Sequence, residues 1–481
     1  REVGLLLLLA FSAWSIVRYL FADGGPAVFD YIVVGGGSTG AVVAGRLGEA
    51  GYSVLVLEAG GSTQISLGGD AEPVAGKWTI FDVPLGWVQV LSDHRWSKEF
   101  QWVVPADPPP AIARGLGGCG IHNAMLYMRG RPADFAEWGA GWSWDDVLPF
   151  YKRSEDNEQF GSSPLHGTGG PVRVTTVASD ELSDFFLDAF STAGLPHVED
   201  FNGPDRIGFG RYQFMIRDGL RDSAAAAFLG ADRRAGYRAP PLIKTHALAT
   251  RLIVEGRRVV GVEYVRGRAP TDKAKRLRAM ARHEVVLSAG AVMTPKLLLL
   301  SGVGEAAKLR RLGIPLVYDN PAVGRGLADG VYAIMQWATR KRNFFKCRLG
   351  TQAEEDQPHA DYCAQQRAMY AAGQHLPLVP RLCSWCGQRR PPPAVGTYIP
   401  HRPNPSLAAS LCSSPPSVVL LLPGHRSNSS LGSPGMSVGA FLRSPYAKGP
   451  EPDLQLTVHP WDKFSRPWSK RLVGVASMEI A

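Results

Sequence analysis

The chain has 481 residues, of which 45% are hydrophobic and 20% are charged, and its formal net charge is +9. These proportions are typical of a folded globular protein and exclude a disordered or fibrous chain, and the length favours two domains. The positive charge is not gathered into Lys and Arg blocks interleaved with aromatic residues, so we expect no nucleic-acid partner.

Residues 1–28 are predicted to be a signal or membrane-anchor segment. An uninterrupted apolar run extends from Gly4 to Val17, between Arg1 and Arg18. It is shorter than the roughly 20 residues that a bilayer span needs, so it fits a signal-peptide core or a short anchor, with an ordinary buried element as the alternative. Because the chain does not start with Met, we expect the natural protein to begin upstream. The segment favours an organellar (mitochondrial or plastid) or membrane-associated location.

From Phe29 the pattern is strand, glycine turn, helix, strand: FDYIVV, GGGSTG, AVVAGRLGEA and YSVLVLEAGG. Gly35, Gly37 and Gly40 form G-x-G-x-x-G in the turn, and Glu58 closes the second strand. Such glycines allow a tight turn and close approach of a pyrophosphate, and an acidic residue at this place accepts from a ribose hydroxyl. The context predicts dinucleotide binding over a purely structural turn. The acidic residue favours FAD or NAD over NADP.

The segments that follow predict further helices and strands. Helical patterns occur at 144–156 and 181–194, and alternating apolar residues at 241–265 predict an antiparallel ribbon. Residues 282–290 have the pattern of a buried strand, and 291–302 that of the helix after it. Together with the first βαβ unit, these elements predict an α/β class of fold.

Residues 343–434 lose all helical and strand periodicity and are rich in Pro, Ser, Cys and Arg. A structureless stretch of this length is improbable inside a compact domain, so we predict that it is disordered or a mispredicted coding sequence. Its C-x-x-C, Cys383 and Cys386, lacks a second pair at metal-site spacing, and we predict no metal site. Order is expected to return in residues 435–481.

Three segments resemble the glucose-methanol-choline (GMC) oxidoreductase family: LEAGG at 57–61, ARGLGGCGIHNAMLYMRGRPADFAEW at 113–138 and GAVMTPKLLLLSGVG at 290–304. The resemblance extends over roughly residues 29 to 330. It implies an FAD-binding Rossmann-like domain with an interleaved antiparallel-sheet (α+β) substrate domain. Residues 29–342 then hold the FAD-binding domain with insertions of the substrate domain, and 435–481 hold part of the C-terminal substrate domain.

The nucleotide motif and the resemblance together predict an FAD site. The resemblance implies that the isoalloxazine and pyrophosphate are lined by Gly117, Gly118, Cys119, Asn123, Ala124, Met125 and Leu126. It also implies that Ala249 contacts the adenine end. The predicted cofactor-binding residues are Gly35, Gly37, Ser38, Thr39, Gly40, Glu58, Ala59, Gly117, Gly118, Cys119, His122, Asn123, Ala124, Met125, Leu126 and Ala249. The family usually has Gly-Ser-Ser where this chain has Gly118, Cys119 and Gly120.

His122 directly precedes Asn123, and choline oxidase-like members resemble this arrangement with a His that bonds covalently to the flavin. A covalent bond raises the reduction potential and prevents loss of the cofactor. The alternative is a polar His packed near a noncovalent FAD.

By resemblance, the reaction is oxidation of a primary alcohol to an aldehyde, with hydride transfer to the flavin and a C-terminal His as the base. The substrate is expected to be a small-molecule alcohol or a fatty acid, since the chain resembles choline and long-chain alcohol dehydrogenases and also algal fatty acid photodecarboxylases. A catalytically silent, truncated flavoprotein is the further alternative. The chain ends 27 residues after Leu454, so we expect the family's catalytic His segment to be missing and leave the catalytic residues unassigned.

Overall fold

A computed structural model gives the fold of most of the chain before residue 329 and of four later segments. The described residues are 26–69, 73–75, 78–84, 86–92, 94–105, 111–177, 181–269, 271, 273–328, 331–338, 438–443, 450–459 and 473–480. The predictions for the apolar run near the N-terminus and for 343–434 concern residues outside these ranges. Within them, no helix has the length and apolar character needed to cross a membrane.

The described residues divide into two compact units, and the chain passes between them several times. Unit 1 contains the residues up to Ser62, Arg114–Gly118 and Phe228–Leu327, and unit 2 contains Thr63–Ala113, Cys119–Ala227 and the described residues from 331 onward. Both units therefore draw on the range 29–342. The sequence-based domain boundaries themselves stay a prediction.

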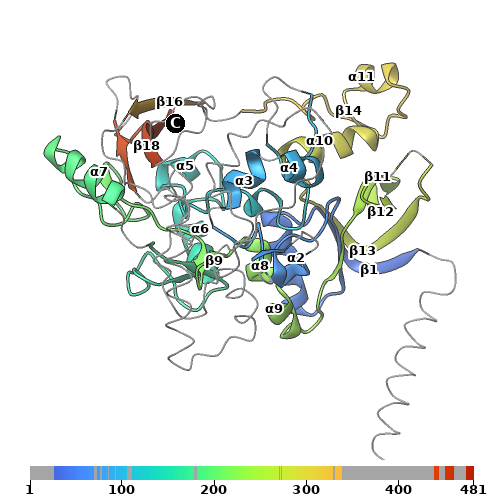
Figure 1. Cartoon of the computed structure of the whole chain (residues 1–481). Helices are drawn as coiled ribbons and strands as arrows, with labels where there is room; N and C mark the ends of the chain where they lie inside the picture. Colours follow the sequence, from blue (N-terminus) through green and yellow to red (C-terminus); the bar gives the residue numbers. More distant parts are fainter. Residues whose placement is uncertain are drawn as a thin grey trace, which may run out of the picture. The chain divides into compact units, whose positions relative to one another are not determined.

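Unit 1 is built on a six-stranded sheet in the order β10-β2-β1-β13-β12-β11 (Figure 1). In chain order the strands are β1 (Ala27–Val34), β2 (Val54–Leu57), β10 (Leu242–Lys244), β11 (Ala247–Glu255), β12 (Arg258–Arg266) and β13 (Leu277–Leu287). β1 pairs in parallel with β2 and β13, and β10 pairs in parallel with β2. β11, β12 and β13 pair antiparallel, so the ribbon predicted over 241–265 is confirmed for β11 and β12, whereas β10 in the same range belongs to the parallel part of the sheet.

Local chemistry explains these elements. The two-residue turn between β11 and β12 contains Gly256 at a φ of +60°, which a hairpin of this length favours. The crossover from β1 to β2 is helix α2 (Ser38–Ala50), whose Gly45 and Gly48 admit the backbone carbonyls of Phe228 and Ala239. One apolar core of the sheet includes Ile32, Val34, Leu55, Leu57, Leu252 and Val262, and the register of β1 with β2 puts the first four on the same face.

Further elements of unit 1 lie before β10 and after β13. They are α9 (Ala231–Ala235), which precedes β10, and then α10 (Gly290–Leu300), β14 (Val303–Gly304), α11 (Ala306–Arg311) and β15 (Tyr318–Asp319). Ser301 ends α10 and its hydroxyl accepts from the backbone N–H of Leu252 at 2.9 Å, which fixes the helix on β11.

Unit 2 contains a five-stranded sheet in the order β16-β19-β18-β17-β7, antiparallel throughout. These strands are β7 (Gly208–Arg211), β16 (Val331–Ala338), β17 (Val438–Leu442), β18 (Leu454–His459) and β19 (Val473–Ile480). Helix α7 (Glu181–Thr192) packs beside it, because Phe186, Leu187 and Phe190 contact Val438 (Figure 1). The predicted α/β class with an antiparallel-sheet second part is confirmed.

The remaining elements are short. They are η1 (Ile65–Leu67), β3 (Pro73–Ala75), β4 (Trp78–Thr79), α3 (Gly86–Ser92), α4 (His94–Phe100), η2 (Gly118–Ile121), α5 (Pro132–Ala136), α6 (Trp144–Ser154), β5 (Glu155–Asn157), β6 (Val172–Val174), β8 (Ile216–Arg217), β9 (Leu220–Arg221) and α8 (Ala224–Leu229). α6 begins with a capping box, since Ser143 and Asp146 satisfy each other's backbone N–H groups.

The aromatic core of unit 2 joins Phe201, Tyr212 and Phe441.

Candidate functional site

The predicted phosphate turn connects β1 to α2, and two of its glycines are required by the protein's own backbone. Gly35 has a φ of +95°, and a Cβ there would lie 2.4 Å from the carbonyl oxygen of Ser288. A Cβ on Gly40 would lie 2.0 Å from the carbonyl oxygen of Gly35. Both distances are far below contact distance, so any side chain at these positions displaces the backbone.

Gly37 differs from those two glycines, because the protein does not require its missing side chain. A Cβ on Gly37 would meet the Cα of Gly118 at 3.7 Å, an ordinary contact, and its φ of −72° suits any residue. Gly37 is the N-cap of α2 and offers no side chain to the first turn, which also lacks acidic residues. The N–H groups of Ser38 and Thr39 belong to this first turn, which provides no intrahelical acceptors for them. The space over Gly37 and these donors fit a pyrophosphate.

Glu58 directly follows β2 and fixes the turn through two backbone hydrogen bonds. Its Oε2 accepts from the N–H of Gly36 at 2.9 Å and its Oε1 accepts from the N–H of Gly60 at 2.8 Å. Burial raises the pKa of the Glu58 carboxyl, against the opposing effect of these two amides. This positioning role was not predicted from sequence. Contacts from Glu58 and the adjacent Ala59 to a ribose stay predictions.

Two more predicted residues of unit 1 lie against the turn. The N–H of Gly117 donates to the carbonyl oxygen of Gly36 at 2.8 Å, and Gly117 and Gly37 form an isolated parallel bridge. A Cβ on Gly118 would lie 2.8 Å from the Cα of Gly37, so only glycine fits there. The LGG segment is therefore brought to the phosphate turn, 80 residues away in sequence. Ala249 lies on β11, where it pairs with Tyr264, and its contact with the adenine end stays a prediction.

The other predicted residues, Cys119 to Leu126, lie in unit 2 and form a strained loop. Cys119 carries an exposed free thiol. Met125 is buried and has a φ of +60°, which is unusual for a residue with a side chain. The Met125 N–H donates to Asn123 Oδ1 at 3.1 Å, and its carbonyl oxygen accepts from the N–H of Met215 at 2.9 Å. The next residue, Leu126, forms an isolated antiparallel β-bridge with Phe214. Ala124 packs on the aromatic core of the unit.

His122 is buried in this loop, and its Nδ1 has no hydrogen-bond partner. Burial, followed by the charge of Arg221, lowers the pKa of His122 to about 4, so the imidazole is neutral at pH 7. A buried polar atom without a partner is rare in a folded protein. A neutral, unpartnered nitrogen is compatible with either sequence-based alternative, a covalent flavin bond or a polar contact to a noncovalent one.

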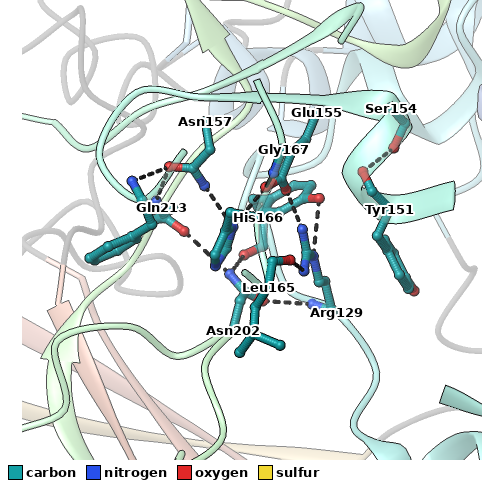
Figure 2. Close-up of polar contacts among 12 residues, drawn as sticks. Arg129, Tyr151, Ser154, Glu155, Asn157, Leu165, His166, Gly167, Asn202 and Gln213 are labelled. Atoms are coloured by element: carbon teal, nitrogen blue, oxygen red, sulfur yellow. Dashed lines mark hydrogen bonds and ion pairs between the residues drawn. The ribbon is translucent and has the colours of Figure 1, made fainter. Parts of the chain in front are cut away.

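A second cluster of titratable groups in unit 2 was not predicted from sequence, and Figure 2 shows its hydrogen bonds. Arg129 Nη2 and Glu155 Oε2 lie 2.5 Å apart, with both side chains almost fully buried. His166 donates from Nδ1 to Glu155 Oε1 at 2.7 Å and from Nε2 to Asp200 Oδ2 at 2.9 Å. Arg129 Nη1 also donates to the carbonyl oxygen of Leu165 at 2.6 Å.

Burial lowers the pKa of His166, but the Asp200 and Glu155 carboxylates outweigh this effect and raise it. Burial in turn raises the pKa of Glu155, and hydrogen bonds from His166 and Tyr127 outweigh it and lower it. Because its members satisfy one another, the cluster stabilises the fold of unit 2 and offers no free group for chemistry. Among the residues that the structure describes, no group of His, Cys, Asp and Glu forms a metal site.

Comparison with known proteins relates most of the described chain to one family. The sequence model of the GMC oxidoreductase family matches residues 29–331. The oxygen-dependent choline dehydrogenase of Pseudomonas putida is 35% identical over 328 residues, which cover 64% of this chain and 54% of that protein. The chain thus spans about half the length of the curated relatives that it matches.

Solved structures share the fold. Pyridoxine 4-oxidase from Mesorbium loti aligns with a TM-score of 0.64 at 23% identity, over 94% of this chain and 71% of that one. An FAD-dependent oxidoreductase from Chaetomium thermophilum aligns with a TM-score of 0.60 at 21% identity, over 93% of this chain and 74% of that one.

The different constraints on the turn glycines lead to a first prediction. Gly40→Ala forces its Cβ against the carbonyl of Gly35 and should lower the free energy of unfolding by about 1–3 kcal/mol or more. Gly37→Ala should cost about 1 kcal/mol or less, yet strongly weaken binding of FAD, because only the ligand needs that space. Urea unfolding and fluorescence titration with FAD measure the two effects. Undiminished FAD affinity of Gly37→Ala would place the pyrophosphate elsewhere.

A second prediction concerns the buried imidazole of His122. Its folded-state pKa lies below the unfolded value, so its stabilising contribution is present above pH 6.5 and is lost as the pH falls toward 4. Over that window the wild-type chain should lose about 3 kcal/mol more stability than His122→Gln. Unfolding curves at intervals from pH 7 to 4 give the difference. Parallel pH profiles of the two proteins would show that His122 is solvated.

A third prediction tests the charged cluster. His166→Gln leaves Glu155 and Asp200 without the imidazolium and should lower the free energy of unfolding by about 3–5 kcal/mol. Because the folded-state pKa of His166 is raised, the loss should be complete below pH 6.5 and shrink as the pH rises through that pKa. The exposed His197→Gln is the control and should be neutral. A pH-independent loss would mean that His166 is uncharged.

Proposed function

Because this chain belongs to the GMC oxidoreductase family, we propose that it binds FAD and oxidises the CH–OH group of a primary alcohol to an aldehyde. The observation that carries the proposal is that a Cβ on Gly37 would make only an ordinary contact, with the Cα of Gly118 at 3.7 Å, beside glycines that the backbone itself requires. A ligand with a pyrophosphate explains why Gly37 has no side chain. The family match then identifies which dinucleotide it is.

FAD is favoured over NAD by the relatives. The match over 29–331 is to a flavoenzyme family, and the related fold from Chaetomium thermophilum is named as FAD-dependent. The turn in unit 1 has the features that a dinucleotide such as FAD requires. The N-terminus of α2 would face the pyrophosphate, and Glu58 follows β2 beside the turn.

When bound, FAD would supply the hydride acceptor. This chain's own residues would bind and orient it: the amides of the first turn of α2 would hold the pyrophosphate, and Glu58 keeps the turn in shape by accepting from Gly36 and Gly60. No described residue is assigned as the base that takes the hydroxyl proton. The relatives named as choline dehydrogenases and pyridoxine 4-oxidase support a small alcohol as the substrate. An organellar or membrane-associated location, directed by residues 1–28, is part of the same proposal.

The proposal is tested by the cofactor and by its reduction. The purified chain should carry a yellow chromophore whose release by heat gives flavin fluorescence, unless His122 holds it covalently, in which case the flavin stays with acid-precipitated protein. Under anaerobic conditions, choline and a long-chain primary alcohol are each added to the flavoprotein and bleaching at the flavin band is followed. A folded preparation that carries only a nicotinamide nucleotide would refute the assignment. Bound flavin that neither alcohol bleaches would identify a silent flavoprotein.

A further inference from the structure

The connection between β12 and β13 in unit 1 carries more than half of the chain's net charge. Residues 266–278 contain six basic residues and one acidic residue, so their formal charge is +5, against +9 for the whole chain. We call the six basic residues the basic patch, and all of them are exposed: Arg266, Arg268, Lys273, Lys275, Arg276 and Arg278. All six belong to unit 1.

Most of this charge is not neutralised by the residues that the structure describes. Arg278 Nη2 lies 2.8 Å from Glu263 Oε1, and its side chain is still 64% exposed. For the patch residues other than Arg268 and Arg278, no described carboxylate lies within ion-pair distance. The patch therefore presents a positive potential to the solvent.

Hydrogen bonds hold the loop of the basic patch on the sheet. The N–H of Gly267 donates to the carbonyl oxygen of His246 at 2.9 Å. Arg114 Nη2 donates to the carbonyl oxygen of Arg268 at 2.9 Å. The antiparallel pairing of β12 with β13 fixes both ends of the loop. The charges are thus carried by a loop with a defined position in unit 1.

The positive surface continues onto the outer face of the antiparallel part of the sheet. Arg251 of β11 lies opposite Glu263 of β12, which lies opposite Arg278 of β13. Residues directly opposite one another in antiparallel strands point to the same face of a sheet. Leu252, the neighbour of Arg251, belongs to the apolar core on the other face. Two cations flank one carboxylate here, so the outer face stays positive.

The N-terminal end of β1 lies beside the basic patch. β1 pairs in parallel with β13, and Ala27 lies opposite Ala279, the residue after Arg278 (Figure 1). The apolar run from Gly4 to Val17 ends ten residues before Ala27 in the sequence. A chain of that length spans at most about 35 Å. A bilayer that held the apolar run would therefore keep the patch close to its surface, and the two contacts would act together.

Charge and composition favour a membrane over a nucleic acid as the partner. Anionic lipid head groups attract clusters of Lys and Arg beside a membrane segment. Residues 266–278 contain no aromatic residue on which a nucleic-acid base could stack. Resting on the proposed membrane-associated location, we propose that the basic patch docks unit 1 on a bilayer surface that contains anionic phospholipids.

The proposal is tested by co-sedimentation of the full 481-residue chain with vesicles. One set of vesicles is phosphatidylcholine alone, and the other contains about one third phosphatidylserine. Each Lys or Arg near an anionic surface strengthens binding about fivefold. The double variant Lys273→Gln, Lys275→Gln should therefore bind the anionic vesicles about 25-fold more weakly than the wild type. Its binding to the neutral vesicles should not change.

Two further double variants serve as controls. Lys273→Arg with Lys275→Arg keeps both charges and should bind like the wild type. Arg233→Gln with Arg238→Gln removes the same charge from exposed positions in and just after α9, which lies apart from β12 and β13 in the same unit (Figure 1). Binding of this variant to the anionic vesicles should stay close to that of the wild type, because salt screens charges that do not face the surface.

Ionic strength gives an independent measure. Raising the salt concentration from about 0.1 M to about 1 M shortens the screening length from about 10 Å to about 3 Å. The preference of the wild type for anionic vesicles should then disappear. A preference that persists in high salt would overturn the proposal.

The remaining outcomes separate this inference from the proposed function. Equal losses in the two Gln variants would show that net charge alone matters and would overturn the inference. Tighter binding to duplex DNA than to anionic vesicles would assign the patch to a nucleic acid and would also overturn it. A wild type that binds neutral and anionic vesicles equally would overturn the inference alone, and one that binds neither would contradict the proposed location too. Binding of FAD and bleaching by alcohols are measured without vesicles and do not depend on these results.

Discussion

The peptide groups around Gly36 join three separate parts of the chain. Its N–H donates to Glu58 at the end of β2, and its carbonyl oxygen accepts from Gly117, while the N–H of Gly35 donates to Leu57. These bonds fix the turn between β1 and α2 from both sides. Positions 35, 40 and 118 need glycine because a Cβ at any of them would overlap neighbouring backbone atoms. The amides of α2 can face a ligand only because this backbone arrangement is already complete.

Unit 2 shows two contrasting ways of burying charge. Around His166 the imidazolium and Arg129 are matched by Glu155 and Asp200, and the cluster is closed to other chemistry. Around Arg221 and His122, donors and a ring nitrogen are buried without partners. Burying an unmatched polar group destabilises a fold, whereas a matched cluster does not. A functional role is therefore better sought at Arg221 and His122 than at the cluster of His166, Glu155 and Asp200, although a His between two acids looks more like a catalytic site.

The strained φ of Met125 belongs to the same arrangement. A non-glycine residue keeps a positive φ only when its surroundings hold it there. Here the backbone is paired on both sides, with Asn123 and Met215, and Asn123 is itself bonded to Arg221. Asn123 thus connects the backbone conformation at Met125 to the buried charge of Arg221.

The sequence by itself determined the βαβ unit, the glycine turn and the antiparallel pairing of β11 with β12. All of these depend on residues close together in the chain, where periodicity and glycine spacing are direct consequences of backbone sterics. Only the tertiary structure decided that Gly117 meets Gly36, that His166 lies between Glu155 and Asp200, and that Arg221 holds Asn123. Their partners are 11 to 98 residues apart in sequence, and a hydrogen bond across such a separation leaves no local pattern. Arg221 lies in the block IRDGLRDSAA, where its neighbour Arg217 looks equivalent, and burial alone distinguishes them.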